Sequence, residues 1–271
     1  MSGAAHRPKR SLGQHFLVDP NLQRKIVEAS GAGPDDDLLE IGPGRGALTR
    51  HLAGRVRRLI LVELDDDLAA ELGRRYAGRR DVEVVHADVL EVEIDRLVDD
   101  PSALRVLGNI PYNITSPILF RLLRRPRPRD VVLMVQGDVA DRIVAAEGTK
   151  AYGALSVGVR SVAAVDRLFR VGRQAFRPVP AVDSAVVRVT PVRPEPLSEE
   201  EEARLRRLVR ASFQWRRKQL RKILRDHPDL AYPPEVAQAA AQATGVALSD
   251  RPERLSPDRF VALAAALSAP R

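Results

Sequence analysis

The stretch Asp37-Leu38-Leu39-Glu40-Ile41-Gly42-Pro43-Gly44-Arg45-Gly46 decides the fold that this sequence predicts. A short, mostly apolar run leads into three glycines at alternate positions, and apolar residues at helical spacing follow at Ala47, Leu48 and Leu52. A strand, a glycine turn and a helix in this order let the backbone approach a nucleotide-like ligand closely. The stretch therefore predicts one strand–turn–helix unit of a doubly wound α/β domain.

The glycine turn has two functional interpretations, besides that of a plain tight turn. As Gly-x-Gly-x-x-Ala it could hold the pyrophosphate of a dinucleotide at a helix N-terminus. As Glu-x-Gly-x-Gly-x-Gly it resembles motif I of S-adenosylmethionine methyltransferases. Glu40, two residues before the first glycine, favours the second interpretation, because a sulfonium cofactor with an amino-acid tail is cationic near its reacting centre.

Three further strands are expected, and each leads to a polar residue: Glu63, Asp88 or Asn109. The strands are expected at 58–62, 82–85 and 104–107. Glu63 could accept hydrogen bonds from two ribose hydroxyls, and a dinucleotide would need the same acid. Asp88 could accept a hydrogen bond from an adenine amino group, or it could be a solvated loop carboxylate. Helical stretches at 66–76 and 116–123 intervene, so the sheet should be largely parallel, with these residues at its carboxyl edge.

The segment Gly108-Asn109-Ile110-Pro111-Tyr112-Asn113 contains two of the three asparagines in the chain. Asn-x-Pro-Tyr suits the methylation of an exocyclic amine on a nucleobase, whose lone pair is delocalised into the ring. The Asn109 side-chain oxygen and the Ile110 carbonyl could both accept hydrogen bonds from the amine and make it more nucleophilic. Pro111 fixes φ and Tyr112 offers a face for a flipped-out base. An ordinary turn would use the same dipeptides.

The composition favours a polyanionic partner and excludes several kinds of site. The net charge is +8, with 39 arginines and five lysines; a GC-rich genome or a warm habitat would explain the ratio but not the positive excess. The absence of cysteine excludes disulfides, thiolate nucleophiles and cysteine metal sites, and the histidines show no ligand spacing, so we expect no metal. No apolar run is long enough to span a membrane, and we expect a cytoplasmic monomer.

The C-terminal part of the sequence predicts a helical domain that binds RNA. Residues 191–196 hold three prolines and are typical of a linker, and Ser198 followed by four glutamates is typical of a helix start. From 203 to 225 there are ten Lys or Arg and no acid, while apolar residues recur at helical spacing. Phosphate binding explains this charge better than a solvated face does. We therefore divide the chain into domains 1–193 and 194–271.

Taken together, these motifs resemble a known family. Nearly from end to end the sequence is similar to the rRNA adenine N6-dimethyltransferases, and within them to the KsgA family, which acts on small-subunit rRNA. Three more segments carry the resemblance: one near the N-terminus, one before the linker and one in the C-terminal domain. They are Lys9-Arg10-Ser11-Leu12-Gly13-Gln14-His15-Phe16-Leu17, Phe176-Arg177-Pro178-Val179-Pro180-Ala181-Val182-Asp183-Ser184 and Gln214-Trp215-Arg216-Arg217-Lys218-Gln219-Leu220. In the family, the N-terminal segment lies over the cofactor.

The resemblance implies a role for each matching residue. Contacts with S-adenosylmethionine are expected at His15, Leu17, Gly42, Gly44, Glu63, Asp88 and Asn109. Contacts with the target base are expected at Asn109, Ile110, Pro111, Tyr112 and Phe176, although Phe176 could instead be a core aromatic. The uncompensated charge of the basic segment adds expected RNA contacts at Arg216, Arg217, Lys218, Arg221 and Lys222.

Three positions depart from the family pattern. His15 stands where the family usually has Asn, and its ring can still donate a hydrogen bond. Ala181 replaces a usual Lys, and Gly137 stands where a Lys is common. Each of the last two departures removes one expected contact with an RNA phosphate.

The resemblance thus implies a Rossmann-like S-adenosylmethionine methyltransferase domain with a mostly parallel sheet, followed by a small all-helical domain. The expected reaction is transfer of methyl groups to N6 of two adjacent adenines near the 3′ end of small-subunit (16S) rRNA, giving dimethyladenosines, with a role in small-subunit assembly. The alternatives are an Erm-type enzyme that dimethylates large-subunit (23S) rRNA and confers macrolide resistance, and a non-catalytic RNA-binding assembly factor. The segment 176–184 and the basic segment favour the first interpretation, and the intact residues 109–112 oppose pure binding.

Overall fold

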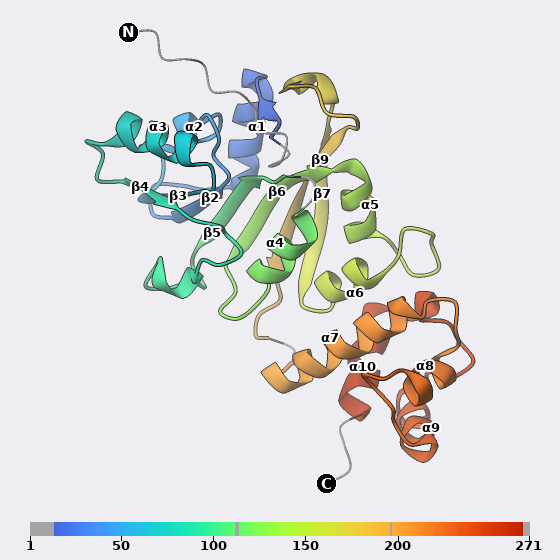
Figure 1. The fold of residues 1–271 in the computed structure, drawn as a ribbon. Helices are drawn as coiled ribbons and strands as arrows, with labels where there is room; N and C mark the ends of the chain where they lie inside the picture. The colour runs from blue at the N-terminus through green and yellow to red at the C-terminus, as the bar shows by residue number, and fades with distance from the viewer. Residues whose placement is uncertain (1–13, 112–113, 196, 268–271) are drawn as a thin grey trace. The chain divides into compact units, whose positions relative to one another are not determined.

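The computed structural model describes residues 14–111, 114–195 and 197–267 (Figure 1). Contacts between residues divide the chain into two compact units. The sheet unit contains the residues up to Ala140 together with Val165–Pro191, and the helical unit contains Asp141–Ala164 together with the residues from Val192 onward. The helical unit therefore includes a segment from the middle of the chain that a single division at 193/194 leaves out.

A seven-stranded sheet forms the centre of the sheet unit. Its strands are β2 (Asp37–Ile41), β3 (Arg58–Glu63), β4 (Val82–His86), β5 (Arg105–Asn109), β6 (Asp130–Gln136), β7 (Ala163–Val171) and β9 (Ser184–Pro191). They lie in the order β4-β3-β2-β5-β6-β9-β7. The first five strands in this order are parallel to one another, and β9 is antiparallel to β6. The four predicted strands are β2 to β5, so the prediction of a largely parallel sheet is confirmed.

Helices cover both faces of this sheet. They are α1 (Pro20–Ser30), α2 (Thr49–Leu52), α3 (Asp66–Tyr76) and α4 (Thr115–Leu122), while α5 (Gly137–Val144) directly follows β6. Side chains alternate along a strand, and the strand residues Leu38 and Leu61 share one hydrophobic cluster with Ile26 of α1, Leu52 of α2 and Leu72 of α3. These three helices therefore cover one face, and α4 lies on the other (Figure 1). Burial on both faces explains why the central strands are almost wholly apolar.

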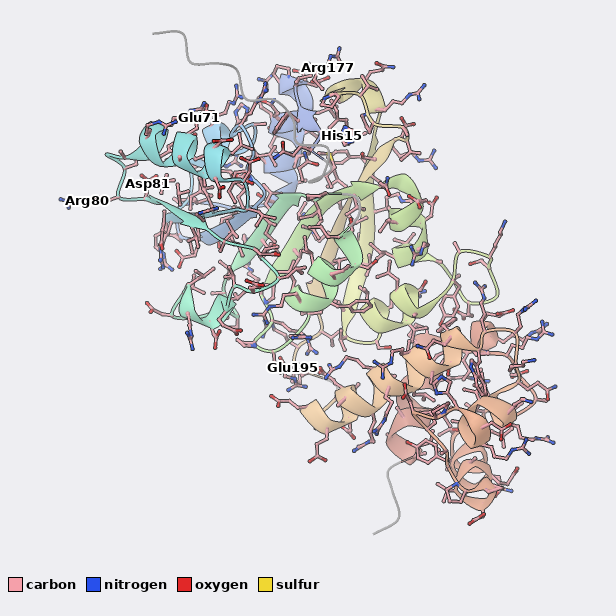
Figure 2. The ribbon with its side chains drawn as sticks, in the orientation of Figure 1. His15, Glu71, Arg80, Asp81, Arg177 and Glu195 are labelled. Atoms are coloured by element: carbon pink, nitrogen blue, oxygen red, sulfur yellow. The ribbon has the colours of Figure 1, made fainter. Side chains whose placement is uncertain are left out.

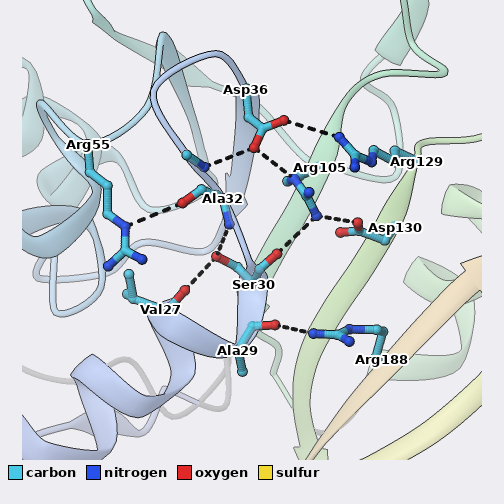
Figure 3. A network of polar contacts seen from close by, with 11 residues as sticks. Val27, Ala29, Ser30, Ala32, Asp36, Arg55, Arg105, Arg129, Asp130 and Arg188 are labelled. Carbon is cyan, nitrogen blue, oxygen red and sulfur yellow. Dashed lines mark hydrogen bonds and ion pairs between the residues drawn. The ribbon is translucent and has the colours of Figure 1, made fainter.

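The C-terminal end of α1 is held by arginines from three other segments (Figure 3). Arg105, Arg188 and Arg55 donate to the carbonyls of Ser30 (3.1 Å), Ala29 (2.6 Å) and Ala32 (3.3 Å) respectively. Cations at this end complement the helix dipole and satisfy carbonyls that lack helical partners. Arg105 also pairs with aspartates that precede β2 and begin β6. These contacts fix α1, and with it the residues that lead into it.

The residues that lead into α1 form one strand of a second, two-stranded sheet. Strand β1 (Phe16–Leu17) pairs antiparallel with β8 (Phe176–Arg177), with Phe16 opposite Arg177 and Leu17 opposite Phe176. Asp19 then caps α1, because its side chain accepts hydrogen bonds from the first free backbone N–H groups of that helix. The N-terminal segment is thereby joined to a loop about 160 positions further along the chain.

The helical unit has its own hydrophobic core. Its main helices are α6 (Ala154–Arg160), α7 (Glu199–Gln214), α8 (Leu220–Asp226), α9 (Pro234–Thr244) and α10 (Pro257–Ala266), and short 3-10 turns occur in the chain at Ile94–Arg96, Arg173–Ala175 and Pro252–Arg254. Ser198 and Glu201 form a capping box at the start of α7, which confirms the predicted helix start. The buried Tyr152 donates through its hydroxyl to the Leu255 carbonyl at 2.6 Å, which ties the middle segment to the C-terminal helices.

Candidate active site

A pocket of about 540 Å³ lies at the carboxyl edge of β2, β3 and β5. Its volume is in the range of small-molecule sites, and its position is where parallel α/β sheets bind ligands. All seven residues predicted to contact the cofactor line this pocket, as do Ile110 and Pro111 of the predicted catalytic segment. The structure thus brings together residues from five separate parts of the sheet unit.

The glycine turn after β2 forms one wall of the pocket. Gly42 and Gly44 have φ values of 63° and 57°, which residues with a Cβ rarely adopt. A Cβ on Gly44 would also lie only 3.1 Å from the Phe16 ring. The Gly44 N–H donates to Glu63 Oε2 at 2.9 Å, so the turn is tied directly to the end of β3.

Backbone donors hold the two predicted nucleoside-binding carboxylates in place. Glu63 Oε1 accepts from the Asp65 N–H at 3.0 Å, and Asp88 Oδ1 accepts from the Leu90 N–H at 2.9 Å. Burial raises the pKa of Glu63, and its hydrogen bonds from backbone N–H groups oppose that shift. Each carboxylate oxygen can accept more than one hydrogen bond, so both groups are oriented for a ligand and retain acceptor capacity.

Glu40 is the most strongly perturbed acid in the pocket. Its side chain is only 2% exposed, and the Thr49 hydroxyl donates to its Oε2 at 2.8 Å. Burial raises the pKa of Glu40 to about 8, and the nearby charge of Glu63 adds to the shift. The carboxyl is therefore mostly protonated at neutral pH, and a cation in the pocket would favour its ionised form.

The acidic residues of the pocket distinguish between a dinucleotide and S-adenosylmethionine as its cofactor. Asp88 would repel the pyrophosphate of a dinucleotide, and Glu40, which also lines the pocket, would ionise beside a cation but not beside a pyrophosphate. The arginines that also line it, Arg45, Arg50 and Arg177, have exposed side chains. A buried acidic wall with acceptors for hydroxyl and amino groups fits S-adenosylmethionine, which is a cationic nucleoside.

Asn109 ends β5 and faces the pocket. Its side-chain Nδ2 donates to the carbonyl of His15 at 3.1 Å, and the next N–H, that of Ile110, donates to the Met134 carbonyl at 3.2 Å. Gly108 permits the close approach of β5 to β2, because a Cβ there would lie 3.0 Å from the Ile41 carbonyl. Of the predicted catalytic segment, Tyr112 and Asn113 lie outside the described residues, as do the residues before Gln14.

Phe176 does not line the pocket. Its side chain has no exposed surface and belongs to the hydrophobic cluster on the α1 face of the sheet, together with Leu17. In this conformation Phe176 is a core aromatic, and its contact with a target base stays a prediction. The neighbouring Arg177 does line the pocket, although no pattern in the sequence indicated a role for it.

The N-terminal segment makes contacts that no local pattern in the sequence signals. Gln14 Nε2 donates to Asp65 Oδ2 at 3.0 Å, and His15 Nδ1 lies 2.8 Å from the Pro178 carbonyl. His15 precedes β1 and Arg177 lies in β8, and both side chains are labelled in Figure 2. Because the paired residues are far apart in the chain, periodicity and turn signals carry no information about the pairing.

The five predicted RNA-binding residues differ in their surroundings within the helical unit. Arg217, Lys218 and Arg221 are exposed, and Lys222 lies 3.9 Å from Asp226. Arg216 is different, because it pairs with Glu253 at 2.8 Å and donates to two carbonyls of the 149–150 segment. Arg216 therefore holds parts of this unit together, and RNA binding by the five residues stays a prediction.

Gly137 and Ala181, which stand where the family has a lysine, differ in the space around them. A Cβ at Gly137 would lie 3.2 Å from the Asp183 carbonyl, so a larger residue there must displace that carbonyl by a few tenths of an ångström. Ala181 is exposed, and its carbonyl accepts from Arg173 Nη1 at 3.4 Å. A longer side chain would be tolerated at 181 more easily than at 137.

The described part of the chain offers neither a metal cluster nor a membrane-spanning helix. No group of three or more His, Asp or Glu residues there is arranged to hold a metal ion. Within the same residues, no helix combines the length and the apolar character needed to cross a bilayer.

Comparison with known families places the chain. The sequence model described as "Ribosomal RNA adenine dimethylase" matches residues 5–268. The chain belongs to the ribosomal RNA adenine dimethylase family. The resemblance seen in the sequence is thereby confirmed, and it covers both units.

Curated relatives and solved structures agree with this membership. "Ribosomal RNA small subunit methyltransferase A" of Chlorobium limicola is 45% identical over 88% of this chain and 89% of its own length, and that of Pseudomonas fluorescens is 40% identical over 96% and 93%. A dimethyladenosine transferase from Plasmodium falciparum aligns with a TM-score of 0.79 at 26% identity, covering 92% of this chain and 96% of its own. The 23S rRNA methyltransferase ErmE aligns with a TM-score of 0.68 at 30% identity, covering 93% and 99%.

Proposed function

We propose that this protein transfers methyl groups from S-adenosylmethionine to N6 of two adjacent adenines near the 3′ end of small-subunit rRNA, and that it takes part in small-subunit assembly. The observation that carries the proposal is the placement of Asn109 beside the acidic, nucleoside-sized pocket. The names of the curated relatives, at 40% and 45% identity, support the small subunit as substrate over the large subunit named for the 30%-identical ErmE.

In the proposed complex, the pocket residues bind and orient the cofactor. Glu63 would accept hydrogen bonds from the ribose hydroxyls, and Asp88 would accept one from the adenine amino group. Glu40 would ionise beside the cationic cofactor, because a nearby cation lowers the pKa that burial raises. When bound, S-adenosylmethionine supplies an electrophilic methyl group.

Asn109 and Ile110 then make the target amine a better nucleophile. The amine offers two hydrogens, and the Asn109 Oδ1 and the Ile110 carbonyl, on neighbouring residues, would accept them. Two such acceptors favour a tetrahedral nitrogen whose lone pair points out of the ring plane, and they stabilise the positive charge that develops on it. Pro111 limits φ just after Ile110 and so restricts where that carbonyl points. No strong base is required, since the cationic nitrogen loses its proton readily to water.

The helical unit supplies the proposed contacts with the RNA backbone. Exposed Arg217, Lys218 and Arg221 present positive charge without a carboxylate partner among the ion pairs found in the described residues. Contacts with phosphates add affinity and register but do not select a base. The selection of adenine therefore falls to the pocket residues.

The deciding experiment is methyl transfer from labelled S-adenosylmethionine to purified small subunits, large subunits and naked rRNAs, with the modified nucleotides mapped. We expect dimethyladenosine at two adjacent positions near the 3′ end of small-subunit rRNA. Product on large-subunit rRNA alone would instead support the Erm-type alternative. Binding of small subunits without any methyl transfer would support a non-catalytic assembly factor.

A further inference from the structure

We propose that the segment Gln14–Val18 is a positioning element for the methyl transfer, in which the His15 carbonyl sets the orientation of the Asn109 amide and the His15 side chain holds that carbonyl in place. This inference rests on the function proposed above and assigns His15 and Gln14 roles in it that are separate from cofactor contact.

The orientation of the Asn109 amide follows from the chemistry of its partner. A carbonyl oxygen can only accept hydrogen bonds, so the group that faces the His15 carbonyl at 3.1 Å must be the NH₂ of the amide. The Asn109 Oδ1 consequently points away from His15. The reversed amide would set two acceptors against each other, with no compensating hydrogen bond. The N-terminal segment therefore decides which end of the amide is presented as an acceptor to the target amine.

Side-chain and backbone anchors on both sides hold this carbonyl. Gln14 is bound to Asp65 at the start of α3, next to Glu63, at 3.0 Å. The His15 Nδ1 lies 2.8 Å from the Pro178 carbonyl and must carry a hydrogen, because that carbonyl has none to donate. The Val18 N–H donates to the Ala175 carbonyl at 2.8 Å, beyond the pairing of β1 with β8.

The same segment also touches the cofactor wall. The Phe16 ring lies beside Gly44, where an added Cβ would come within 3.1 Å of it, and the Arg45 guanidinium lies 4.6 Å from the ring centroid. One short stretch thus contacts the glycine turn, Asn109 and the loop after Phe176. It fixes the acceptor for the amine relative to the cofactor before RNA arrives, which is what an orientation-dependent displacement requires.

An isosteric pair of substitutions at His15 tests the idea. In His15→Asn the amide nitrogen can take the place of Nδ1 and donate to the Pro178 carbonyl. In His15→Asp the side chain has the same shape but, when ionised, offers only acceptors to that carbonyl. We expect kcat of the Asp variant to be lower than that of the Asn variant by about tenfold or more, because only the Asp variant displaces the carbonyl that orients Asn109. Both variants remove the ring that lines the cofactor pocket, so their cofactor affinities, measured by calorimetry, should agree with each other within about threefold.

A second readout does not depend on activity. The chain has only three asparagines, so labelling with ¹⁵N-asparagine gives three side-chain NH₂ signals, and Asn109→Ala identifies that of Asn109. In the parent, this NH₂ should exchange slowly with solvent, since it is bonded to the His15 carbonyl. In His15→Asp, which keeps three asparagines, its protection should fall. Thermal melts establish whether each variant is folded.

The outcomes separate this inference from the proposed function. Equal kcat in the Asn and Asp variants, or a rapidly exchanging Asn109 amide in the parent, would overturn the positioning role even if the parent methylates small subunits normally. A kcat that is about tenfold or more lower in the Asp variant than in the Asn variant, at similar cofactor affinity in the two, supports it. If the parent failed to methylate any rRNA, the proposed function would fall, and the amide signal alone would still decide whether the segment holds Asn109.

Discussion

The pocket of the sheet unit and the basic surface of the helical unit are built in opposite ways. The pocket takes its residues from segments far apart in the chain, and its groups are buried and fixed by hydrogen bonds such as those from Gly44 and Asp65 to Glu63. The basic surface takes its charges from one continuous stretch, 203–225, and Arg217, Lys218 and Arg221 project into solvent. The pocket depends on the exact placement of its groups, whereas the basic surface depends on its positive charge.

This difference predicts how each region responds to change. Removing one fixed group from the pocket should cost a large factor that salt does not alter, because buried interactions are weakly screened. Removing one exposed cation should cost a small factor that depends on salt, because each phosphate contact releases counterions. Substitutions in the two regions can therefore be ranked by expected effect.

The largest effect is expected for Asn109→Ala. Methyl transfer should fall by about a thousandfold, because the variant lacks the acceptor that acts on the reacting amine. Cofactor affinity should stay within about tenfold, since Asn109 is only one of several groups lining the pocket. Single-turnover kinetics with saturating RNA, beside calorimetry with S-adenosylhomocysteine, measure the two quantities. Near-normal turnover would show that the pocket does not work through this acceptor.

Glu40→Gln tests burial in the pocket through pH. Glu40 binds its proton up to about pH 8 in the folded protein, against a usual pKa of 4.5. Between these values the folded state holds more protons than the unfolded state, so stability falls as pH rises. The substitution removes this titration and should flatten the fall by up to about 1.4 kcal/mol per pH unit. Urea unfolding at pH 5.5, 7 and 8.5 measures it.

The control for that experiment is Glu71→Gln, which changes an exposed acid of α3 that pairs with Arg75. Its slope of stability against pH should match that of the parent. If Glu40→Gln and Glu71→Gln gave the same slope, Glu40 would be ionised in the folded protein, and the acidic wall would be more hydrated than its 2% exposure indicates.

Glu63→Ala should weaken cofactor binding by about 1–3 kcal/mol, because it removes the acceptor proposed for two ribose hydroxyls. Calorimetry with S-adenosylmethionine measures this change in affinity. Glu63→Gln provides a matched variant that keeps the shape and one acceptor oxygen, and it should bind more tightly than the alanine variant. Tighter binding of NAD than of S-adenosylhomocysteine by the parent would contradict the assignment of the glycine turn.

The sequence predicted the local parts of the pocket, but it could not predict the contacts that join them. Strands β2 to β5 and the residues Glu63, Asp88 and Asn109 follow from short apolar runs and the polar residues after them. The pairing of β1 with β8 joins residues 159 and 161 positions apart, and the burial of Phe176 depends on packing across the whole sheet. The protonation of Glu40 depends on its desolvation, which only the folded chain creates.

The basic segment shows the same limit in the helical unit. A charge run predicts a basic surface, yet Arg216 within it faces Glu253 and two backbone carbonyls. Nothing in the spacing of the run distinguishes this arginine from Arg217. Its partners lie 37 and about 66 positions away, so its role follows from tertiary contacts alone.

Charge reversal at Arg217, Lys218 and Arg221 should weaken RNA binding by about tenfold and reduce the log–log salt slope by up to about 0.9 for each phosphate that is no longer neutralised. Turnover at saturating RNA and cofactor affinity should not change, because these residues are proposed to touch only the RNA backbone. Arg216→Glu is the matched comparison: it should lower the melting temperature by breaking its pair with Glu253, whereas the triple variant should melt near the parent. An unchanged slope in the triple variant would make the stretch a solvated face.

The smallest effect is expected for Ala181→Lys, which adds a cation to the sheet unit. Ala181 is exposed on the loop between β8 and β9, and a lysine there would extend into solvent without displacing any buried group. If this loop lies near the RNA backbone, affinity should rise about twofold to threefold at low salt, and the salt slope should steepen by up to about 0.9. Ala181→Gln adds similar length without charge and should leave both quantities unchanged. RNA binding at several salt concentrations distinguishes the two variants.

A steeper slope for the lysine variant alone would show that the sheet unit, which holds the pocket, also contributes phosphate contacts through this loop. Equal slopes for both variants would confine the electrostatic contribution to the helical unit and to the exposed arginines that precede the loop, Arg173 and Arg177.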